Sequence, residues 1–460
     1  PISLVKIIYG LLKPDSGLLE WQGTPLKILG PSQARALGIG MVFQHFSLFD
    51  AFTVCENIAI ASDSNLSLKT LHSKIMEVSE DYGLPLDPDR YVHSLSVGEK
   101  QRIEIIRCLL QDPKLLILDE PTSVLTPQEA KNLFVTLETL AASGCAILYI
   151  SHKLEEVKRL CMKATILRNG AVVATCDPSS ESARTMAGRM IGSKLNNIQR
   201  RKSPESGRSR VRINKLSLKS SDPFGIDLKS ISLNVSRGEV VGIAGVAGNG
   251  QNELMAALSG EVIQSYPNDT IVFDDICVAG MRVSERRAMG SCFVPEERYG
   301  HAAIKEMSLK DNALLTSSKN INLVKKGLLQ FDAINDLTEK IIFDFDVRTT
   351  GSKMESGSLS GGNLQKFILG REILQEPGIL IISQPTWGVD AGAALVLRKS
   401  LLELAARGCA VLIISQDLDE IFEICDRIAV LYQGNLSALM DTETASMDQV
   451  GLLMGGGNGE

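Results

Sequence analysis

An internal repeat at a constant offset is the feature that most limits how this chain can fold. The segment SLSVGEKQRIEIIRCLLQDPKLLILDEPTSVLT begins at Ser94, and SLSGGNLQKFILGREILQEPGILIISQPTWGVD begins at Ser358, 264 positions later (358 − 94). The similar segments that begin at Gly144 and Gly408 keep the same offset of 264. Similarity held in one register over this length indicates two copies of one domain.

A polar segment separates the two copies. Residues 193–210 (SKLNNIQRRKSPESGRSR) contain few large apolar side chains, which is typical of a linker. We therefore place a first domain at 1–192 and a second at 211–460. With 460 residues, of which 44% are hydrophobic, each copy is large enough to bury a core of its own.

Short apolar runs alternate with helical patterns in both copies. Four runs are expected to form buried parallel strands: Leu115–Leu118, Ala146–Ile150, Ile379–Ile382 and Ala410–Ile414. In the first copy, helices are expected at Pro127–Ala142 and Lys153–Cys161, and residues 53–90 form a more helical stretch that predicts a separate lobe. This alternation predicts an α/β fold with a mostly parallel sheet in each domain.

Composition excludes several classes of protein. The formal charge is −6 and basic residues are mixed with acidic ones, so nothing indicates a nucleic-acid-binding surface. No apolar run approaches the roughly 20 residues of a membrane span. The nine cysteines form no C-x-x-C pair, which indicates reduced thiols. If the protein acts on a membrane, it does so through partner subunits.

Two carboxylates follow the first of the predicted strands. Asp119 and Glu120 come directly after Leu115–Leu118, at the strand end where α/β proteins bind ligands. An aspartate there can hold Mg²⁺ bound to phosphates, and the adjacent glutamate can polarise an attacking water. Two acids after a strand can also simply begin a loop, so this pair alone leaves both interpretations open.

Ser96 and Gly98 precede the carboxylates and begin a predicted helix. A hydroxyl and free backbone N–H groups at such a position can bind a phosphate. Serine is also a common helix N-cap, and taken singly this interpretation is the stronger one.

The joint pattern resembles a known family. LSVGE, LLILDEPTS and YISH, in this order and spacing, resemble the signature, Walker B and switch-histidine motifs of the ATP-binding-cassette (ABC) ATPases. The resemblance covers essentially the whole chain and implies two P-loop NTPase domains in tandem, each with a mostly parallel sheet core and a helical lobe. It implies that the chain binds ATP and Mg²⁺, with Glu120 as general base and His152 at the γ-phosphate. Asp119 and Gln44 would coordinate the metal. The nucleotide-binding positions that the resemblance implies are Gln44, Ser96, Gly98, Gly245, Gly248, Gly250, Ser360, Gly361 and Gly362.

The second copy departs from the family pattern at its chemical positions. Its glycine loop, Gly245–Gly250, is followed by Gln251 and Asn252, where the family has Lys and Ser or Thr. The other altered positions are Ser383 and Gln384 in place of the Walker B acids, Gln416 in place of the switch histidine, and Pro295–Glu297 in the Q-loop region. We expect this pocket to bind nucleotide weakly or statically and to hydrolyse it poorly.

In this family each ATP lies between the phosphate loop of one domain and the signature of the other. The resemblance therefore implies that the two cassettes of this chain pair with each other. The competent site would join Asp119, Glu120 and His152 to the second signature, Ser360–Gly362. The impaired site would join the glycine loop at 245–250 to Ser96 and Gly98.

The first ten residues resemble a helix already under way, without a cap or an initiator methionine. The family's phosphate loop should precede this helix, so we expect the chain to be incomplete at its N-terminus. As written, it should turn over ATP poorly, and restoring the upstream strand and loop should recover activity.

Fused cassettes with a short linker and a degenerate second half resemble the ATPase subunits of bacterial sugar and nucleoside importers. That branch implies two transmembrane permease subunits, an extracytoplasmic solute-binding protein or lipoprotein, and a peripheral position on the cytoplasmic face of the inner (plasma) membrane. One alternative is a truncated cassette fragment that does not hydrolyse ATP. A tandem cassette protein acting on ribosomes is disfavoured by the short linker and Gln384, and a DNA-repair cassette by the lack of long heptad segments and zinc cysteines.

Overall fold

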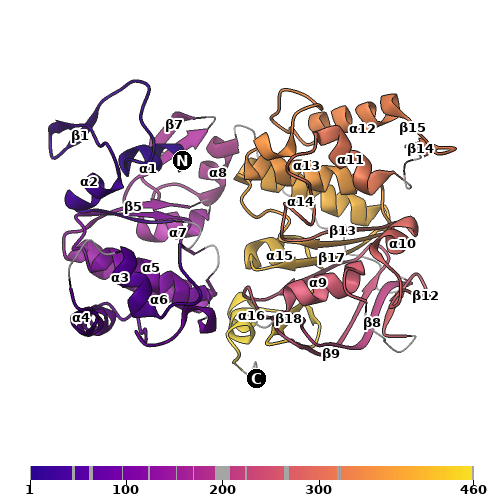
Figure 1. The fold of residues 1–460 in the computed structure, drawn as a ribbon, viewed down its shortest axis with the longest axis horizontal. Helices are drawn as coiled ribbons and strands as arrows, with labels where there is room; N and C mark the ends of the chain where they lie inside the picture. Colours follow the sequence, from indigo (N-terminus) through magenta and orange to yellow (C-terminus); the bar gives the residue numbers. More distant parts are fainter. Residues whose placement is uncertain are drawn as a thin grey trace. The chain divides into compact units, whose positions relative to one another are not determined.

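The computed structural model describes residues 2–43, 47–61, 66–95, 97–122, 125–151, 153–168, 170–191, 208–222, 225–263, 269–318, 321 and 323–457. The chain divides into two compact units, Pro1–Leu195 and Asn196–Glu460 (Figure 1). The first strand of unit 2 begins at Ser209, two residues before the predicted start of the second domain. The predicted linker otherwise lies outside the described residues, apart from Arg208.

Unit 1 consists of parallel strands, two antiparallel pairs and helices. In chain order its elements are α1 (Ile2–Ile8), β1 (Leu19–Trp21), β2 (Thr24–Leu26), α2 (Pro31–Ala36), β3 (Ile39–Val42), α3 (Val54–Ala61), α4 (Leu68–Asp81), η1 (Val92–Ser94), α5 (Val97–Leu109), β4 (Leu115–Asp119), α6 (Pro127–Ala142), β5 (Ala146–Ile150), α7 (Leu154–Leu160), β6 (Ala164–Arg168), β7 (Ala171–Cys176) and α8 (Ala183–Ile191). β3, β4 and β5 form a parallel sheet in that order. α3 and α4 pack on each other and on α5, which forms the helical lobe predicted for residues 53–90.

Unit 2 repeats this plan with a larger sheet. Its elements are β8 (Ser209–Leu218), β9 (Leu228–Ser236), β10 (Val240–Ala244), α9 (Gln251–Ser259), β11 (Ile271–Phe273), β12 (Ile276–Cys277), α10 (Val283–Ala288), β13 (Ser291–Val294), α11 (Leu309–Ser317), β14 (Val324–Lys325), β15 (Leu328–Leu329), α12 (Phe331–Asp344), η2 (Ser356–Ser358), α13 (Gly361–Ile373), β16 (Ile379–Ser383), α14 (Ala391–Ala406), β17 (Ala410–Ser415), α15 (Leu418–Ile424), β18 (Arg427–Tyr432), β19 (Asn435–Leu436), β20 (Met440–Asp441) and α16 (Met447–Met454). β13, β16, β17, β10 and β18 are parallel in that order, and β12, β11, β8 and β9 form an antiparallel sheet. In Figure 1, α13 and α14 lie on one side of the parallel sheet and α9 on the other.

The predicted strands form where expected, and three of them extend one residue further. β4 includes Asp119, β16 includes Ser383 and β17 includes Ser415. The helix predicted at Pro127–Ala142 has those bounds, whereas the next one spans Leu154–Leu160 and is one residue shorter at each end. Both units therefore have the predicted α/β fold with parallel sheet cores.

The backbone confirms that the two units are copies. Glu120 and Gln384, each the first residue after its strand, have φ angles of 49° and 50°. Their backbone N–H groups donate to the equivalent carbonyls of the neighbouring strand, Ile150 at 2.9 Å and Ile414 at 2.8 Å. The constant sequence offset therefore corresponds to equivalent positions in space within each unit.

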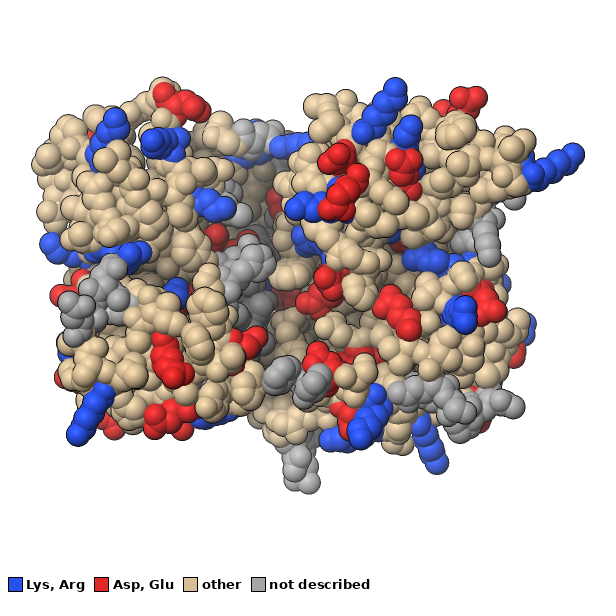
Figure 2. Space-filling model, in the orientation of Figure 1, with Lys and Arg blue, Asp and Glu red and all other residues tan. Residues whose placement is uncertain are grey.

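The charged side chains and the cysteines are arranged as is usual in a globular protein. Acidic and basic side chains are interspersed on the face shown in Figure 2. All nine cysteines are free, and five of them are buried. Among the described residues, no helix has both the length and the apolar character needed to cross a bilayer.

Candidate nucleotide site

The two carboxylates of unit 1 lie together at the carboxyl end of a parallel strand. Asp119 ends β4 and is only 5% exposed, while Glu120 is half-buried. The φ of 49° puts Glu120 in the left-handed region, which costs a residue with a Cβ about 1–3 kcal/mol. Gln384 of unit 2 has the same conformation, so this turn belongs to the fold that both units share.

The chemistry of the donor set agrees with a metal that arrives together with a nucleotide. The described residues contain no group of three or more His, Cys, Asp or Glu side chains able to hold a metal ion by themselves. Mg²⁺ in nucleotide sites usually takes one or two carboxylates and fills its remaining positions with phosphates and water. Asp119 at the end of β4 fits that role.

A carboxylate on α7 connects the loop after Glu120 to β5 and the loop that follows it. Glu156 accepts hydrogen bonds from Thr122 Oγ1 at 2.6 Å, Tyr149 Oη at 2.7 Å and Ser151 Oγ at 3.1 Å. Burial and the charge of Glu156 raise the pKa of Tyr149, so its phenol remains a donor. No motif pointed to this cluster, although the repeat makes Glu156 equivalent to Glu420 of the second copy.

Three of the predicted site residues, Gln44, Ser96 and His152, lie outside the described residues, so their contacts stay predictions. Gly98 lies in the first turn of α5 and is buried. A Cβ on Gly98 would lie 1.9 Å from Oε1 of Glu129. A side chain at this position would therefore have to displace the Glu129 carboxylate, whose Oε2 accepts from Thr126 in the cap of α6.

The glycine loop of unit 2 connects β10 to α9, as predicted. Gly248 and Gly250 have φ angles of 81° and 108°, which favour glycine. Gly245 lacks space for a side chain, because a Cβ there would lie 2.7 Å from both Gln251 Nε2 and Leu431 O. The backbone therefore keeps the form of a phosphate-binding loop.

Gln251 fills this loop with its own amide. Its Nε2 donates to Val246 O at 2.8 Å, and its Oε1 accepts from the backbone N–H of Asn249 at 2.9 Å. The side chain is 7% exposed. One backbone N–H that could bind a phosphate is thus already satisfied within the loop, which supports the prediction of weak or static nucleotide binding.

The two positions that replace the Walker B acids in unit 2 are neutral, whereas the Q-loop region contains Glu296 and Glu297. Ser383 is 3% exposed and its Oγ has no hydrogen-bond partner among the described residues. Gln384 is 8% exposed, and its Oε1 accepts from the backbone N–H of Gln416 at 3.4 Å. A hydroxyl and an amide can coordinate a metal but bring no negative charge to neutralise it, and neither can act as a general base. Unlike Asp119 and Glu120, this pair therefore offers Mg²⁺ no carboxylate.

The signature of unit 2 begins α13. Ser360 caps the helix, and its Oγ accepts from the backbone N–H of Asn363 at 3.4 Å and from its side-chain amide at 2.9 Å. Gly361 and Gly362 form the first turn. The capping role weighed for Ser96 is thus present at the equivalent residue of unit 2.

Arg298 is a residue near this signature that sequence analysis did not single out. Its Nε donates to Gln365 Oε1 at 2.9 Å, and its guanidinium lies over the Trp387 ring at 5.5 Å and bonds to the Trp387 carbonyl. Burial lowers the pKa of Arg298. Gln365 in turn donates to Gln384 O at 3.3 Å. Arg298 therefore joins the loop after β13, the signature helix and the loop after β16.

Glu420 makes unit 2 sensitive to pH. It is 1% exposed, it accepts from Ser415 Oγ at 2.9 Å, and Arg398 Nε lies 3.8 Å away. Burial raises the pKa of Glu420 from 4.5 to about 7. A carboxyl with a raised pKa in the native state contributes stability below pH 4.5 that is lost as the pH rises through 7.

We therefore expect the unfolding free energy of unit 2 to depend less on pH between pH 5 and 8 in Glu420→Gln than in the original protein. Relative to the variant, the original protein should lose about 1 kcal/mol or more over this range. Chemical denaturation at a series of pH values measures the difference. Parallel pH profiles for the two proteins would contradict the prediction.

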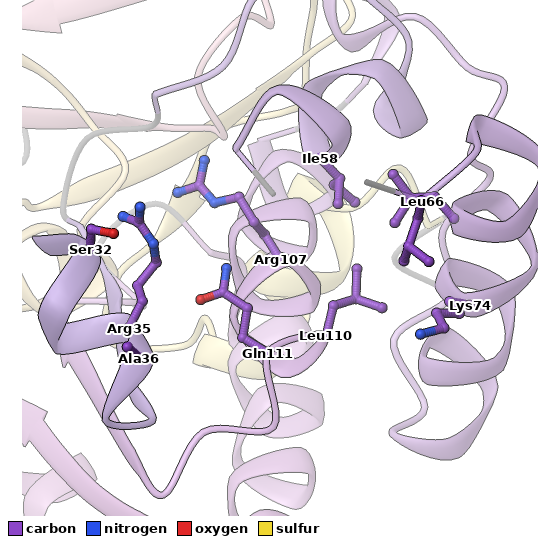
Figure 3. Close-up of a pocket in the computed structure, with 10 residues that line it drawn as sticks. Ser32, Arg35, Ala36, Ile58, Leu66, Lys74, Arg107, Leu110 and Gln111 are labelled. Atoms are coloured by element: carbon purple, nitrogen blue, oxygen red, sulfur yellow. The ribbon is translucent and has the colours of Figure 1, made fainter. Parts of the chain in front are cut away.

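A cavity of about 500 Å³ opens between the helical lobe and the sheet domain of unit 1. Residues of α2, α3, α4 and α5, and of the segments just before α4 and just after α5, line this cavity. Its lining combines large aliphatic side chains with cations and a few polar groups: Ser32, Arg35, Ala36, Ile58, Leu66, Leu71, Lys74, Arg107, Leu110 and Gln111. Figure 3 shows Arg35 and Arg107 on one side of this cleft, with Leu66 and Lys74 on the other.

Comparison with known proteins identifies the family. The ABC transporter family matches residues 3–123 and 228–387, which is more than half of the chain. The chain belongs to the ABC transporter family. It is a tandem ABC ATPase, and the fold expected from the repeat is confirmed.

Curated relatives align with nearly the whole of this ABC protein. The nucleoside import ATP-binding protein NupA of Lactococcus lactis is 37% identical, and the alignment covers 99% of this chain and 90% of that protein. The guanosine import ATP-binding protein NupO of Bacillus subtilis is 34% identical over 99% of this chain and 89% of that protein. A ribose import ATP-binding protein of L. lactis is 30% identical over 99% and 91%.

Solved structures agree on the fold. An archaeal ribosome recycling factor in complex with a ribosomal stalk protein matches with a TM-score of 0.65, covering 96% of this chain and 83% of that one, at 19% identity. A structure described as RNase-L inhibitor matches with a TM-score of 0.64 at 18% identity, covering 99% and 86%. At such low identity the likeness concerns the fold, whereas the import proteins are similar in sequence.

Proposed function

We propose that this chain is the ATP-hydrolysing subunit of an importer for nucleosides or simple sugars. It works as a peripheral subunit on the cytoplasmic face of the bacterial inner membrane, with two transmembrane permeases and an extracytoplasmic solute-binding protein or lipoprotein. The observation that supports this most strongly is the alignment, at 30–37% identity over nearly the full chain, with nucleoside and ribose import ATP-binding proteins.

We further propose that hydrolysis depends on the carboxylates of unit 1. Glu120 draws a proton from the attacking water and His152 contacts the γ-phosphate, while Asp119 and Gln44 would hold Mg²⁺. The metal would neutralise charge on the phosphates. Ser360–Gly362 of the second signature completes this site, and Ser96 and Gly98 serve the impaired one. The neutral groups Ser383 and Gln384 support this division of roles.

The cleft of unit 1 suits a segment of a permease. Its aliphatic side chains can bury an apolar helix face, and Arg35, Lys74 and Arg107 add three cations to the same lining. Complementary charge selects the partner and its orientation. We therefore propose that the occupant is an apolar permease helix that carries carboxylates.

Charge reversal in the cleft tests the partnership. Lys74→Glu should weaken association with detergent-solubilised permease subunits by about tenfold or more, since like charges across an interface cost several kcal/mol. Lys69→Glu is the matched control, because Lys69 is exposed on the same helix and does not line the cleft. Equal affinities of the two variants, measured by surface-immobilised binding, would exclude this docking site.

A further inference from the structure

A buried ion pair on α5 connects the cleft of unit 1 to the chain that follows β3. Glu104 is 1% exposed, and its Oε1 accepts from the backbone N–H of Ser47 at 3.2 Å. Its Oε2 forms an ion pair with Arg107 one turn along the helix. Burial raises the pKa of Glu104, and the charge of Arg107 opposes that rise. The carboxylate is thus held between one backbone N–H and one guanidinium.

The other end of this pair belongs to the cleft. The Arg107 side chain is 14% exposed and contributes to the cleft lining. Ser47 lies three residues after Gln44, which is predicted to bind the nucleotide and its metal, and we call residues 44–47 the nucleotide-sensing segment. The pair Glu104–Arg107 therefore connects the surface proposed for docking to this segment.

The segment around Ser47 has an equivalent in unit 2, which allows the two to be compared. Asn57 accepts from the backbone N–H of Phe49 at 2.7 Å, and Asn312 accepts from that of Ile304 at 2.8 Å. These matching contacts, each eight residues apart, align the two segments and make Ala302 the equivalent of Ser47.

In unit 2 an arginine of the signature helix bonds directly to the backbone at this position. Arg371, the repeat equivalent of Arg107, donates through Nη2 to Ala302 O at 2.8 Å. Arg371 is 1% exposed, and Ile368 occupies the position of Glu104. Unit 2 thus holds the segment with one fully buried arginine. Unit 1 holds it through a carboxylate whose counterion can be reached from the cleft.

We infer that Glu104 is a positioning residue that transmits occupancy of the cleft to the nucleotide-sensing segment of unit 1. A carboxylate of the docked helix competes for Arg107, and Glu104 then loses its partner and changes its hold on Ser47. A ligand shifts such an equilibrium only by its different affinity for the two states, and Arg107 supplies that difference. This inference rests on the proposed permease partnership.

The test uses protein whose first unit carries its phosphate-binding strand and loop. It compares the ATP turnover of that protein alone with its turnover after assembly with permease subunits in proteoliposomes. Glu104→Gln keeps an acceptor for the Ser47 N–H but cannot hold Arg107 by charge. The ratio of stimulated to basal turnover should fall about fivefold or more, which is the factor that a typical allosteric coupling free energy produces. Arg107→Gln should lower the ratio similarly, and the double variant no further, because the two residues act as a unit.

Glu138→Gln is the matched control, since Glu138 is an exposed glutamate of the same unit, outside the cleft. Thermal unfolding of each variant identifies any general loss of fold, and Arg107→Lys, which retains the charge, should restore part of the ratio. A normal ratio in Glu104→Gln, with stimulation intact, would overturn this inference alone. Absence of any association or stimulation in the unmodified protein would instead overturn the proposed function.

Discussion

Glu120→Gln should lower the rate of ATP turnover by about 10²–10⁴-fold, because a positioned general base contributes a factor of that size. The effect is expected in protein whose first unit carries its phosphate-binding strand and loop. Glutamine has nearly the same shape as glutamate but does not accept the proton of the attacking water. Nucleotide binding, followed with a fluorescent ATP analogue, should persist while phosphate release falls.

The second unit provides the matched control for this substitution. Gln384 has the backbone geometry of Glu120, with φ angles of 50° and 49°. Gln384→Asn should therefore leave turnover within about twofold, as expected of a change that removes no transition-state interaction. Rapid turnover after Glu120→Gln would show that the assignment of the competent site is wrong.

Glu372→Ala should reduce the unfolding free energy of unit 2 by about 3–5 kcal/mol, because it leaves the buried Arg371 and the half-buried Arg287 without their counterion. Glu372 is 0% exposed, and its oxygens accept from Arg287 Nη1 at 2.7 Å and Arg371 Nε at 2.8 Å. Arg287 also donates to Phe293 O at 3.1 Å, which connects the network to β13. Urea denaturation followed by far-ultraviolet circular dichroism measures the loss.

The lowered pKa of Glu372 predicts that unit 2 loses stability in acid. Burial alone would raise the pKa of Glu372, but Arg287 and Arg371 lower it from 4.5 to about 2. Its contribution to stability is therefore present above pH 4.5 and is lost as the pH falls towards 2. Glu372→Ala should lack this acid-sensitive component.

The control for Glu372→Ala is an exposed pair of the same unit. Lys340 and Asp344 pair at 2.7 Å on α12 with side chains 60% and 33% exposed. Asp344→Ala should cost at most about 0.5 kcal/mol, as is usual for pairs in contact with water. Similar losses for the two variants would show that the buried network contributes no more than a surface pair.

The repeat and its motifs were sufficient to predict the architecture. Backbone conformation follows local patterns, so the strand that ends in Asp119 and the glycine loop before Gln251 were predictable from neighbouring residues. The same patterns showed that Ser383 and Gln384 replace the acids of the first copy. These features are local, because each depends on residues a few positions apart.

The contacts that define each site had to come from the tertiary structure. Gln251 stands where the family has lysine, and only the folded loop shows its amide bonded to Val246 and Asn249. Glu104 and Ser47 are 57 residues apart, and no sequence pattern connects them.

The sequence alone determined that the chain contains two ABC cassettes and that the first keeps the two carboxylates, Asp119 and Glu120, that the second lacks. Only the tertiary structure decided which side chains connect the signature helices to the segments after β3 and β13. The physical reason is that periodicity and motifs specify backbone elements. Hydrogen bonds and ion pairs between distant side chains depend instead on how those elements pack.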